Sequence, residues 1–300
     1  MLLSFKQMEL QTDTIIYKDF SIAILRLDLI GDKLQGNKYF KLKYNIAEAK
    51  NQKLDTLLTF GGAFSNHIYA TAAAGKAHQI KTIGIIRGED NPNNPTLQFA
   101  RSMDMHLEFI NREAYQHRAT PAFETTLKNK FGNFYLLPEG GTNDFAIQGC
   151  AEILSGIKNK YDRIFLPVGT GGTIAGIIST PELKTHVTGI SVLRGDDTLT
   201  KTIKALANSP NVNITWDMNF NFHYGGYAKF SSKLIEFIRK FYKEYHIMLD
   251  PIYTGKMMGG IFFMIDHDKI EPGKKILAIH TGGLQGIDGW EYRFEKIIKA

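Results

Sequence analysis

The sequence predicts an α/β protein with two domains, each an open, mostly parallel, twisted sheet flanked by helices. Apolar, β-branched runs of strand length alternate with helix-length periodic segments along almost all of its 300 residues, which is typical of parallel α/β architecture. Clusters of glycine and small polar residues directly follow several predicted strands. Because ligands bind at the carboxyl ends of such strands, we expect these clusters to surround one shared cleft.

Each element follows from its local pattern. Strands are predicted where short apolar runs lie between turn residues, at residues 23–29, 56–60, 82–86, 107–110, 134–137, 163–168, 189–193 and 275–280. Helices are predicted where helix formers recur with helical spacing, at residues 39–50, 68–78, 95–103, 121–131, 145–159, 198–207, 231–245 and 256–266. No linker rich in Pro, Gly or Ser interrupts the chain, so its domains should be joined by short crossings.

Composition and charge exclude several classes of protein. Contents of 43% apolar and 22% charged residues exclude disordered and fibrous chains. The net charge of +6 is mild and scattered, whereas nucleic-acid binding requires a concentrated basic patch. No apolar run approaches the ~20 residues of a membrane span, and the N-terminus lacks a signal-peptide core. The single cysteine, Cys150, permits no internal disulfide and no cysteine-rich metal site. We expect a cytoplasmic protein without a metal.

A glycine-threonine bend between a predicted strand and a helix start is suited to bind an anion. It consists of Gly169, Thr170, Gly171, Gly172 and Thr173. Glycines let the backbone approach an anion, and a helix N-terminus adds free N–H donors and a favourable dipole. The dinucleotide pattern fails because Ile174 replaces its third glycine. A phosphate fits here, although a tight turn that binds nothing would leave the same pattern.

A lysine follows the first predicted strand and its turn. Lys38 ends the run Gly36-Asn37-Lys38, in the first turn of the helix predicted to begin near Tyr39. Partial desolvation there would disfavour its ammonium form and make the amine more nucleophilic, as a Schiff base requires. Most lysines are solvated surface charges, so position alone leaves both interpretations open.

Five motifs in this order resemble the pyridoxal-phosphate enzymes of the tryptophan synthase β-like fold, fold type II. They are Gly36-Asn37-Lys38, Gly61-Gly62 with Ser65-Asn66-His67, the glycine-threonine bend, Asp250-Pro251-Ile252-Tyr253-Thr254-Gly255-Lys256, and His280-Thr281-Gly282-Gly283. Within that fold, residues 22–283 resemble the family of 1-aminocyclopropane-1-carboxylate deaminase and D-cysteine desulfhydrase. The resemblance implies pyridoxal 5'-phosphate as cofactor, a small amino acid as substrate and a homodimer. It also implies a large domain of residues 1–39 plus 141–300, a smaller inserted domain of residues 40–140, and the cofactor between them.

The resemblance implies a role for each matched residue. Lys38 would form the Schiff base with the cofactor and later move the α-proton of the substrate. Asn66 would donate to the cofactor's phenolic oxygen, and residues 169–173 would hold its phosphate. Ser65, with Asn66 and His67 beside it, would bind the substrate carboxylate.

Three further side chains complete the expected site. Tyr227 and Tyr253 would lie near the reacting carbons, and Thr254 would face the pyridine nitrogen. Simpler interpretations stay open beside these roles. Ser65 and Asn66 could only cap the helix at Ile68, His67 could be local scaffolding, and either tyrosine could be a core residue.

The residues at two positions favour one reaction within the family. Its deaminases carry glutamate at the position of Thr254 and leucine at that of Thr281, whereas its D-cysteine desulfhydrases carry small hydroxyl residues at both. A carboxylate keeps the pyridine nitrogen protonated and the ring a strong electron sink, while expulsion of thiolate can proceed with a weaker one. We therefore expect α,β-elimination of D-cysteine to pyruvate, ammonia and hydrogen sulfide.

Two alternatives remain at this point. One is a 1-aminocyclopropane-1-carboxylate deaminase that gives 2-oxobutanoate and ammonia. The other is a non-catalytic protein that binds a phosphate ligand or acts in regulation. Phe64, Tyr69 and residues 225–229 depart from the family pattern, and we expect these positions to line or frame the substrate pocket.

Overall fold

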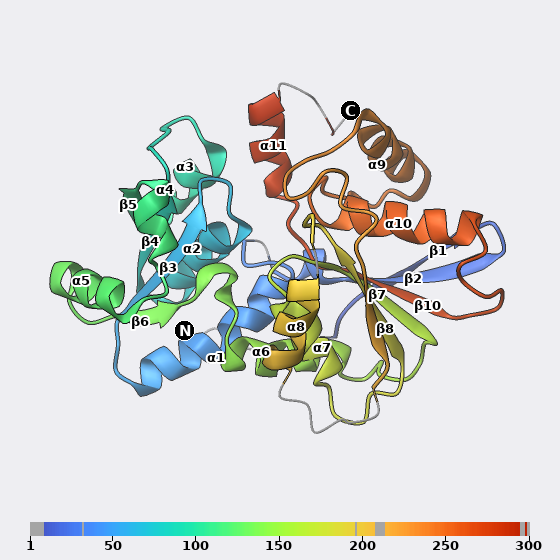
Figure 1. The fold of residues 1–300 in the computed structure, drawn as a ribbon, viewed down its shortest axis with the longest axis horizontal. Helices are drawn as coiled ribbons and strands as arrows, with labels where there is room; N and C mark the ends of the chain where they lie inside the picture. The colour runs from blue at the N-terminus through green and yellow to red at the C-terminus, as the bar shows by residue number, and fades with distance from the viewer. Residues whose placement is uncertain (1–8, 32, 196, 208–213, 295–297, 299–300) are drawn as a thin grey trace.

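The computed structural model describes residues 9–31, 33–195, 197–207, 214–294 and 298. They form two sheets flanked by helices (Figure 1). The larger sheet has the order β1-β2-β10-β7-β8-β9. Its strands are β1 (Thr12–Tyr17), β2 (Phe20–Arg26), β7 (Arg163–Val168), β8 (His186–Ser191), β9 (Trp216–Asn219) and β10 (Ile276–His280). Apart from the antiparallel pair β1 and β2, neighbouring strands are parallel. The predicted α/β class is confirmed.

The smaller sheet is wholly parallel and has the order β5-β4-β3-β6. Its strands are β3 (Thr56–Gly62), β4 (Lys81–Arg87), β5 (His106–Ile110) and β6 (Tyr135–Leu137). All four lie within residues 40–140, and the strands of the larger sheet all lie outside that range. We propose that the domains divide along these two sheets.

Eleven α-helices connect and cover the sheets in the described part of the chain. They are α1 (Asn37–Asn51), α2 (Asn66–His78), α3 (Pro95–Ser102), α4 (Arg112–Gln116), α5 (Pro121–Phe131), α6 (Asp144–Ala151), α7 (Gly172–Ile178), α8 (Asp197–Leu206), α9 (Ser232–Tyr245), α10 (Thr254–Asp266) and α11 (Gly286–Phe294). Three short 3-10 turns, η1 (Leu27–Leu29), η2 (Glu139–Gly141) and η3 (Glu152–Leu154), continue or precede them. In these residues no helix is both long and apolar enough to cross a bilayer.

Most predicted elements are present, and the differences have local causes. The strands β1 and β9 were not predicted, because each is a sheet edge with several exposed or half-exposed residues and little apolar signal. The helix predicted for residues 145–159 ends at Ala151 and continues only as η3, and Gly156 beyond it has φ +81°, which prevents a helix from running on to residue 159. The strand predicted to run to Leu29 instead turns into η1.

Helix α1 ties the two halves together. Its Phe40 packs in the core of the larger sheet, while Leu42 and Ile46 pack in the core of the smaller one. It lies against α6, where Gly149 leaves room for the Phe40 carbonyl that a Cβ would meet. Figure 1 shows α1 and α6 crossing between the two sheets. Because Lys38 lies in the first turn of α1, both cores position it.

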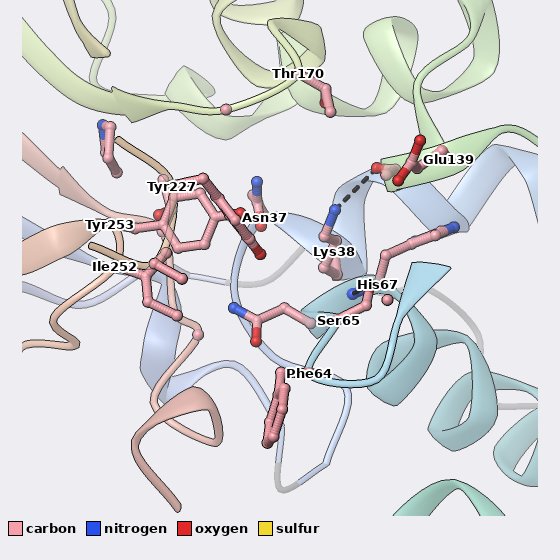
Figure 2. A pocket seen from close by; sticks show the side chains of 18 of the residues that line it. Asn37, Lys38, Phe64, Ser65, His67, Glu139, Thr170, Tyr227, Ile252 and Tyr253 are labelled. Atoms are coloured by element: carbon pink, nitrogen blue, oxygen red, sulfur yellow. Dashed lines mark hydrogen bonds between the residues drawn. The ribbon is translucent and has the colours of Figure 1, made fainter. Parts of the chain in front are cut away.

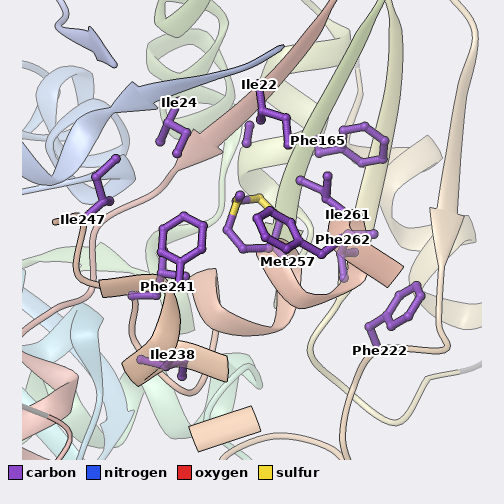
Figure 3. Packing of buried hydrophobic residues seen from close by; sticks show 14 of the residues in the cluster. Ile22, Ile24, Phe165, Phe222, Ile238, Phe241, Ile247, Met257, Ile261 and Phe262 are labelled. Atoms are coloured by element: carbon purple, nitrogen blue, oxygen red, sulfur yellow. The ribbon is translucent and has the colours of Figure 1, made fainter. Parts of the chain in front are cut away.

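The main core lies between the larger sheet and helices α9 and α10. Phe241 of α9, together with Met257 and Phe262 of α10, packs onto Ile22, Ile24 and Phe165 of the sheet (Figure 3). Each fully buried side chain of this size contributes about 1.5–3 kcal/mol through loss of water contact. This packing fixes the start of α10, which carries Tyr253 and Thr254 to the carboxyl edge of the sheet.

Candidate active site

A pocket lies at the carboxyl ends of strands from both sheets. Its volume is about 670 Å³, within the roughly 300–1,000 Å³ usual for small-molecule sites. The loops after β3, β7 and β10 line it together with Lys38 and Tyr253. Figure 2 shows Lys38, Ser65 and the two tyrosines around this space. The three glycine-rich loops singled out in the sequence therefore do meet in one cleft.

Two lysines share one carbonyl in this pocket. The Nζ atoms of Lys38 and Lys41 lie 2.8 and 3.0 Å from the carbonyl oxygen of Gly140, and Lys41 also donates to Thr142 at 3.0 Å. Burial lowers the pKa of Lys38 well below its usual range, and the charge of Lys41 lowers it further. Burial also lowers the pKa of Lys41. A neutral amine on Lys38 is the nucleophilic form.

The turn before Lys38 is tied to both neighbouring loops. Gly36 has φ +68°, and a Cβ there would collide with the Thr281 carbonyl. The Asn37 N–H donates to that same carbonyl at 3.0 Å, and the Asn37 side chain donates to Thr173 Oγ1 at 2.7 Å. The motif Gly36-Asn37-Lys38 thus serves to hold the lysine in front of the glycine-threonine bend.

The glycine-threonine bend approaches the lysines closely. Gly171 has φ +85°, which favours glycine, and a Cβ on Gly172 would lie 2.9 Å from Lys41 Nζ and 2.7 Å from Thr142 Oγ1. All five residues of the bend line the pocket. Lys41, only 2% exposed, therefore places a cation beside the predicted phosphate site. The sequence reasoning missed it, although its spacing of three from Lys38 puts both lysines on one helix face.

Ser65 caps α2, as one of the two open interpretations held. Its Oγ accepts hydrogen bonds from the N–H groups of His67 at 3.2 Å and Ile68 at 3.3 Å. Both Ser65 and Asn66 line the pocket as well. The Asn66 amide lies against the last loop, where a Cβ on Gly283 would be 2.8 Å from its Nδ2. Capping and ligand contact are compatible, because the cap uses only the hydroxyl oxygen as an acceptor.

His67 lies at the back of the pocket, 2% exposed. Thr59 Oγ1 donates to the Leu137 carbonyl at 3.0 Å, so it accepts from His67 Nε2–H at 2.8 Å. This assigns the tautomer and leaves Nδ1 as an acceptor without a hydrogen-bond partner in the described residues. Burial lowers the pKa of His67 well below its usual range, with Lys38 and Lys41 adding to the effect. The ring is neutral, and Nε2 is committed to scaffolding.

The two predicted tyrosines lie together on one wall of the pocket. Their rings meet edge to face with centroids 6.1 Å apart (Figure 2). Tyr253 packs on the bend, since a Cβ on Gly169 would be 3.3 Å from its ring. Burial raises the pKa of Tyr253 well above its usual range, and Tyr227 raises it further. The Tyr253 phenol therefore stays protonated at neutral pH.

The structure does not bring Thr254 to the pocket. This residue is 0% exposed, and its hydroxyl donates to Asp250 Oδ1 at 2.7 Å while accepting from the Asp250 N–H at 2.9 Å. This placement does not support the expectation that Thr254 faces a pyridine ring, because its hydroxyl helps to close the turn that starts α10. Thr281, by contrast, lines the pocket.

A buried lysine holds the segment that carries Tyr227. Lys256 is 0% exposed, and its Nζ donates to the carbonyls of His223 and Gly226 at 2.8 Å each. Between them the backbone has positive φ at Tyr224, Gly225 and Gly226. Burial lowers the pKa of Lys256 to about 8, against a partial rise caused by Asp250. The Lys256 motif position was visible in the sequence, but this contact with a distant loop was not.

The departures from the family pattern are divided between the pocket and its surroundings. Phe64, Tyr227 and Ala228 line the pocket. Tyr69 does not, and it stacks on Phe99 with ring centroids 3.6 Å apart and an interplanar angle of 7°.

The family model for pyridoxal-phosphate dependent enzymes matches residues 24–282 of this chain. The chain belongs to this family. Its cofactor is pyridoxal 5'-phosphate, and it acts as an enzyme on a small amino-acid substrate. Among curated relatives, the bifunctional D-cysteine desulfhydrase/1-aminocyclopropane-1-carboxylate deaminase of Arabidopsis thaliana is 33% identical over 290 residues, covering 88% of this chain and 72% of that protein.

Other relatives carry one or the other name. A D-cysteine desulfhydrase of Yersinia pestis is 28% identical, covering 89% of this chain and 88% of the relative. A putative 1-aminocyclopropane-1-carboxylate deaminase of Pyrococcus horikoshii is also 28% identical, with 88% and 85% covered. The crystal structure of an ACC deaminase homologue superposes with a TM-score of 0.77 at 26% identity, covering 89% of this chain and 85% of the other. The predicted family is confirmed, while the substrate within it is not resolved.

The residues present fit this cofactor. A phosphate needs an open glycine backbone and a positive charge, and the bend with Lys41 beside it supplies both. An aldehyde needs an unprotonated amine, and the depressed pKa of Lys38 favours one. The aromatic ring requires room in the same pocket, and its volume of about 670 Å³ provides that room. We assign Lys38, Lys41, Asn66 and the bend to the cofactor in the proposal that follows.

Proposed function

We propose that this enzyme performs α,β-elimination on a small D-amino acid, most directly D-cysteine, to give pyruvate, ammonia and hydrogen sulfide. One observation carries the choice. In the described residues, Glu139 is the carboxylate that lines the pocket, and it forms an ion pair with Arg118 at 2.8 Å. The wall near the last loop offers the hydroxyl of Thr281 instead. A site without a carboxylate for the pyridine nitrogen suits a good leaving group such as thiolate.

Pyridoxal phosphate, when bound, supplies an aldehyde for amine exchange and an electron sink for the carbanion at the substrate Cα. The chain's own residues supply binding and proton transfer. The N-terminal turn of α2, with the side chains of Ser65 and Asn66, binds the substrate carboxylate, and His67 supports this turn through its hydrogen bond to Thr59. The amine of Lys38 takes the proton from Cα, since burial keeps it in the basic, neutral form.

The tyrosine pair acts at the other end of the substrate. Because burial keeps the phenol of Tyr253 protonated, this residue can donate a proton to the departing sulfur. Tyr227, which is 47% exposed, covers the reacting carbons from the solvent side. The packing of Tyr253 on Gly169 holds its hydroxyl at a fixed distance from the bend.

The deaminase reaction is the second candidate, because several relatives carry that name. Opening a cyclopropane expels carbon and requires a stronger electron sink, which the carboxylate of the family's deaminases would provide. The non-catalytic alternative is not retained, since the chain belongs to a family of enzymes. A cytoplasmic homodimer, expected from the sequence, remains a proposal.

Product analysis separates the candidates. Purified enzyme is incubated with D-cysteine, with L-cysteine and with 1-aminocyclopropane-1-carboxylate, and sulfide, pyruvate and 2-oxobutanoate are measured. The proposal predicts sulfide and pyruvate in equal amounts from D-cysteine and much slower release from the L-enantiomer. Release of 2-oxobutanoate from the cyclopropane acid, with no sulfide from D-cysteine, would overturn it in favour of the deaminase.

A further inference from the structure

The pocket carries more positive charge than the cofactor and a simple substrate require. Beside the neutral amine of Lys38, its described lining includes four basic side chains, those of Lys41, Arg87, Arg112 and Arg293. The one lining carboxylate is already paired with Arg118. The two lysines serve the cofactor in the proposal above. The arginines remain, although a substrate such as D-cysteine brings one carboxylate, which the start of α2 can bind.

Arg87 contacts residues of the smaller sheet and of the helix after β5. It ends β4 and is the Cα partner of Gly62 at the end of β3. Its guanidinium lies back over that glycine, because a Cβ on Gly62 would be 3.8 Å from Arg87 Nη2. It also lies over the ring of Tyr115, 5.5 Å from the centroid. Arg87 forms no ion pair with a carboxylate among the residues that the structure describes.

Arg87 and Tyr227 line the same pocket. Tyr227, on the opposite wall, has its pKa raised by burial, and the charges of Glu139 and Arg87 act on it in opposite directions. Arg112 follows β5, the strand that pairs with β4, and starts α4 on the same side of the pocket. Both arginines therefore line the pocket at the carboxyl edge of the smaller sheet, and the tyrosine pair lines the same pocket from the larger one.

We propose that Arg87, assisted by Arg112, binds an anionic β-substituent, so that the enzyme accepts D-amino acids carrying a β-phosphate ester. This assignment deepens the proposed function and rests on it. A guanidinium matches the geometry of phosphate oxygens through paired hydrogen bonds. In O-phospho-D-serine the Cα–H and Cβ–O bonds break and phosphate leaves with the bonding pair. Hydrolysis of the remaining aminoacrylate consumes one water and gives pyruvate and ammonia.

A binding experiment tests Arg87 without turnover. D-2-Amino-3-phosphonopropanoate carries the phosphonate on carbon and cannot eliminate it, and D-2-aminobutanoate is a comparable ligand without that charge. Calorimetry on the purified enzyme should give a dissociation constant about 10- to 100-fold weaker for the phosphonate in Arg87→Gln. The effect on D-2-aminobutanoate should be far smaller, and Arg87→Lys should recover part of the affinity.

The chain offers a matched control. Arg101 in α3 is exposed, pairs with Asp90 at 2.6 Å and does not line the pocket. Arg101→Gln should bind both ligands as the wild type does. Equal losses for both ligands in Arg87→Gln would assign Arg87 to the shared carboxylate, and unchanged phosphonate binding would remove it from the site. Either result would overturn the proposal.

A kinetic arm separates failure of this inference from failure of the proposed function. O-Phospho-D-serine is compared with β-chloro-D-alanine, whose substituent is uncharged, by release of pyruvate. Arg87→Gln should reduce kcat/KM at least ~10-fold more for the phosphate ester than for the chloro compound. Turnover of β-chloro-D-alanine alone would leave elimination intact and overturn the anionic subsite. Turnover of neither would overturn the elimination, and the calorimetry would still decide the assignment of Arg87.

Discussion

The two ends of the pocket are built differently. At the cofactor end, Gly36, Gly140 and Gly172 bring backbone segments together so closely that a Cβ would meet a neighbour within about 3 Å. Lys41 is buried and Lys38 half-buried, and the two share a single carbonyl. At the substrate end, Arg87 and Arg112 are exposed side chains, and the Tyr227 segment has positive φ on either side of that residue, at Gly226 and Ala228.

This difference shows that the cofactor chemistry restricts the residues at one end of the pocket, while the residues at the substrate end can vary. The cofactor end must hold the same group in every member of the family, so close packing leaves few residue choices. The substrate end depends on side chains that reach across solvent, and there residues of this chain depart from the family pattern.

Loss of Lys38 should have the largest effect. Lys38→Ala removes both the amine that binds the cofactor and the base that takes the α-proton, so elimination should fall at least ~10³-fold. The side chain is only partly buried, so the fold should be retained. Steady-state pyruvate release with a circular dichroism melt measures both. Activity within tenfold of the wild type would exclude Lys38 from catalysis.

Lys41→Met should weaken cofactor binding without abolishing its attachment to Lys38. The substitution removes a charged donor beside the bend, which is worth about 1.5–3 kcal/mol, or roughly 10- to 100-fold in the dissociation constant of pyridoxal phosphate. Titration of cofactor-free protein with pyridoxal phosphate measures it, with Lys50→Met on the same helix as the control. An unchanged affinity for pyridoxal phosphate in Lys41→Met would show that Lys41 does not bind the phosphate.

Lys256→Met should reveal the stability that this buried amine contributes as a function of pH. Lys256 has a pKa of about 8 in the folded protein, whereas an unfolded lysine has about 10.4. Between these values the unfolded chain holds the extra proton, so stability from Lys256 rises with pH and is lost as pH falls through 8. The wild-type advantage over Lys256→Met in urea unfolding should grow by about 3 kcal/mol from pH 7 to pH 10.5. A stability difference between the two proteins that does not change with pH would contradict the lowered pKa of Lys256.

The smallest effects are expected from substitution of the two threonines, Thr281 and Thr254, and the two variants should differ in which property changes. Thr281→Val, at the pocket wall, should shift the absorption band of the bound cofactor. Thr254→Val should leave that band in place and lower stability by about 1–2 kcal/mol, because the Asp250 N–H loses its acceptor. Absorbance scans and urea unfolding of the two matched variants decide between them. The reverse pattern would restore Thr254 to the ring nitrogen.

The cofactor end could largely be predicted from the sequence because its glycines are local signals. Gly36, Gly169 and Gly171 mark turns next to predicted strands, and all lie where the chain bends into the pocket. The α/β class could be predicted because apolar runs of strand length alternate with helix-length segments along the chain. The edge strands β1 and β9 did not, since exposed edge residues carry no strong period.

The substrate end could not be predicted because its contacts join distant segments. Arg87 is an ordinary arginine at the end of a strand, and only the register with Gly62 shows that it lies over the pocket. Lys256 reaches carbonyls some 30 residues earlier. The structure does not support the expected role of Thr254, because its hydroxyl bonds to Asp250, a local partner four residues earlier.

Lys38, and not its neighbour Lys41, is the residue that we expect to condense with the cofactor in front of the glycine-threonine bend. Borohydride reduction of the purified enzyme fixes the cofactor to its lysine, and peptide mass mapping then locates the modified residue. We expect a single reduced adduct, on Lys38. An adduct on Lys41, or a protein that takes up no reducible cofactor, would contradict it.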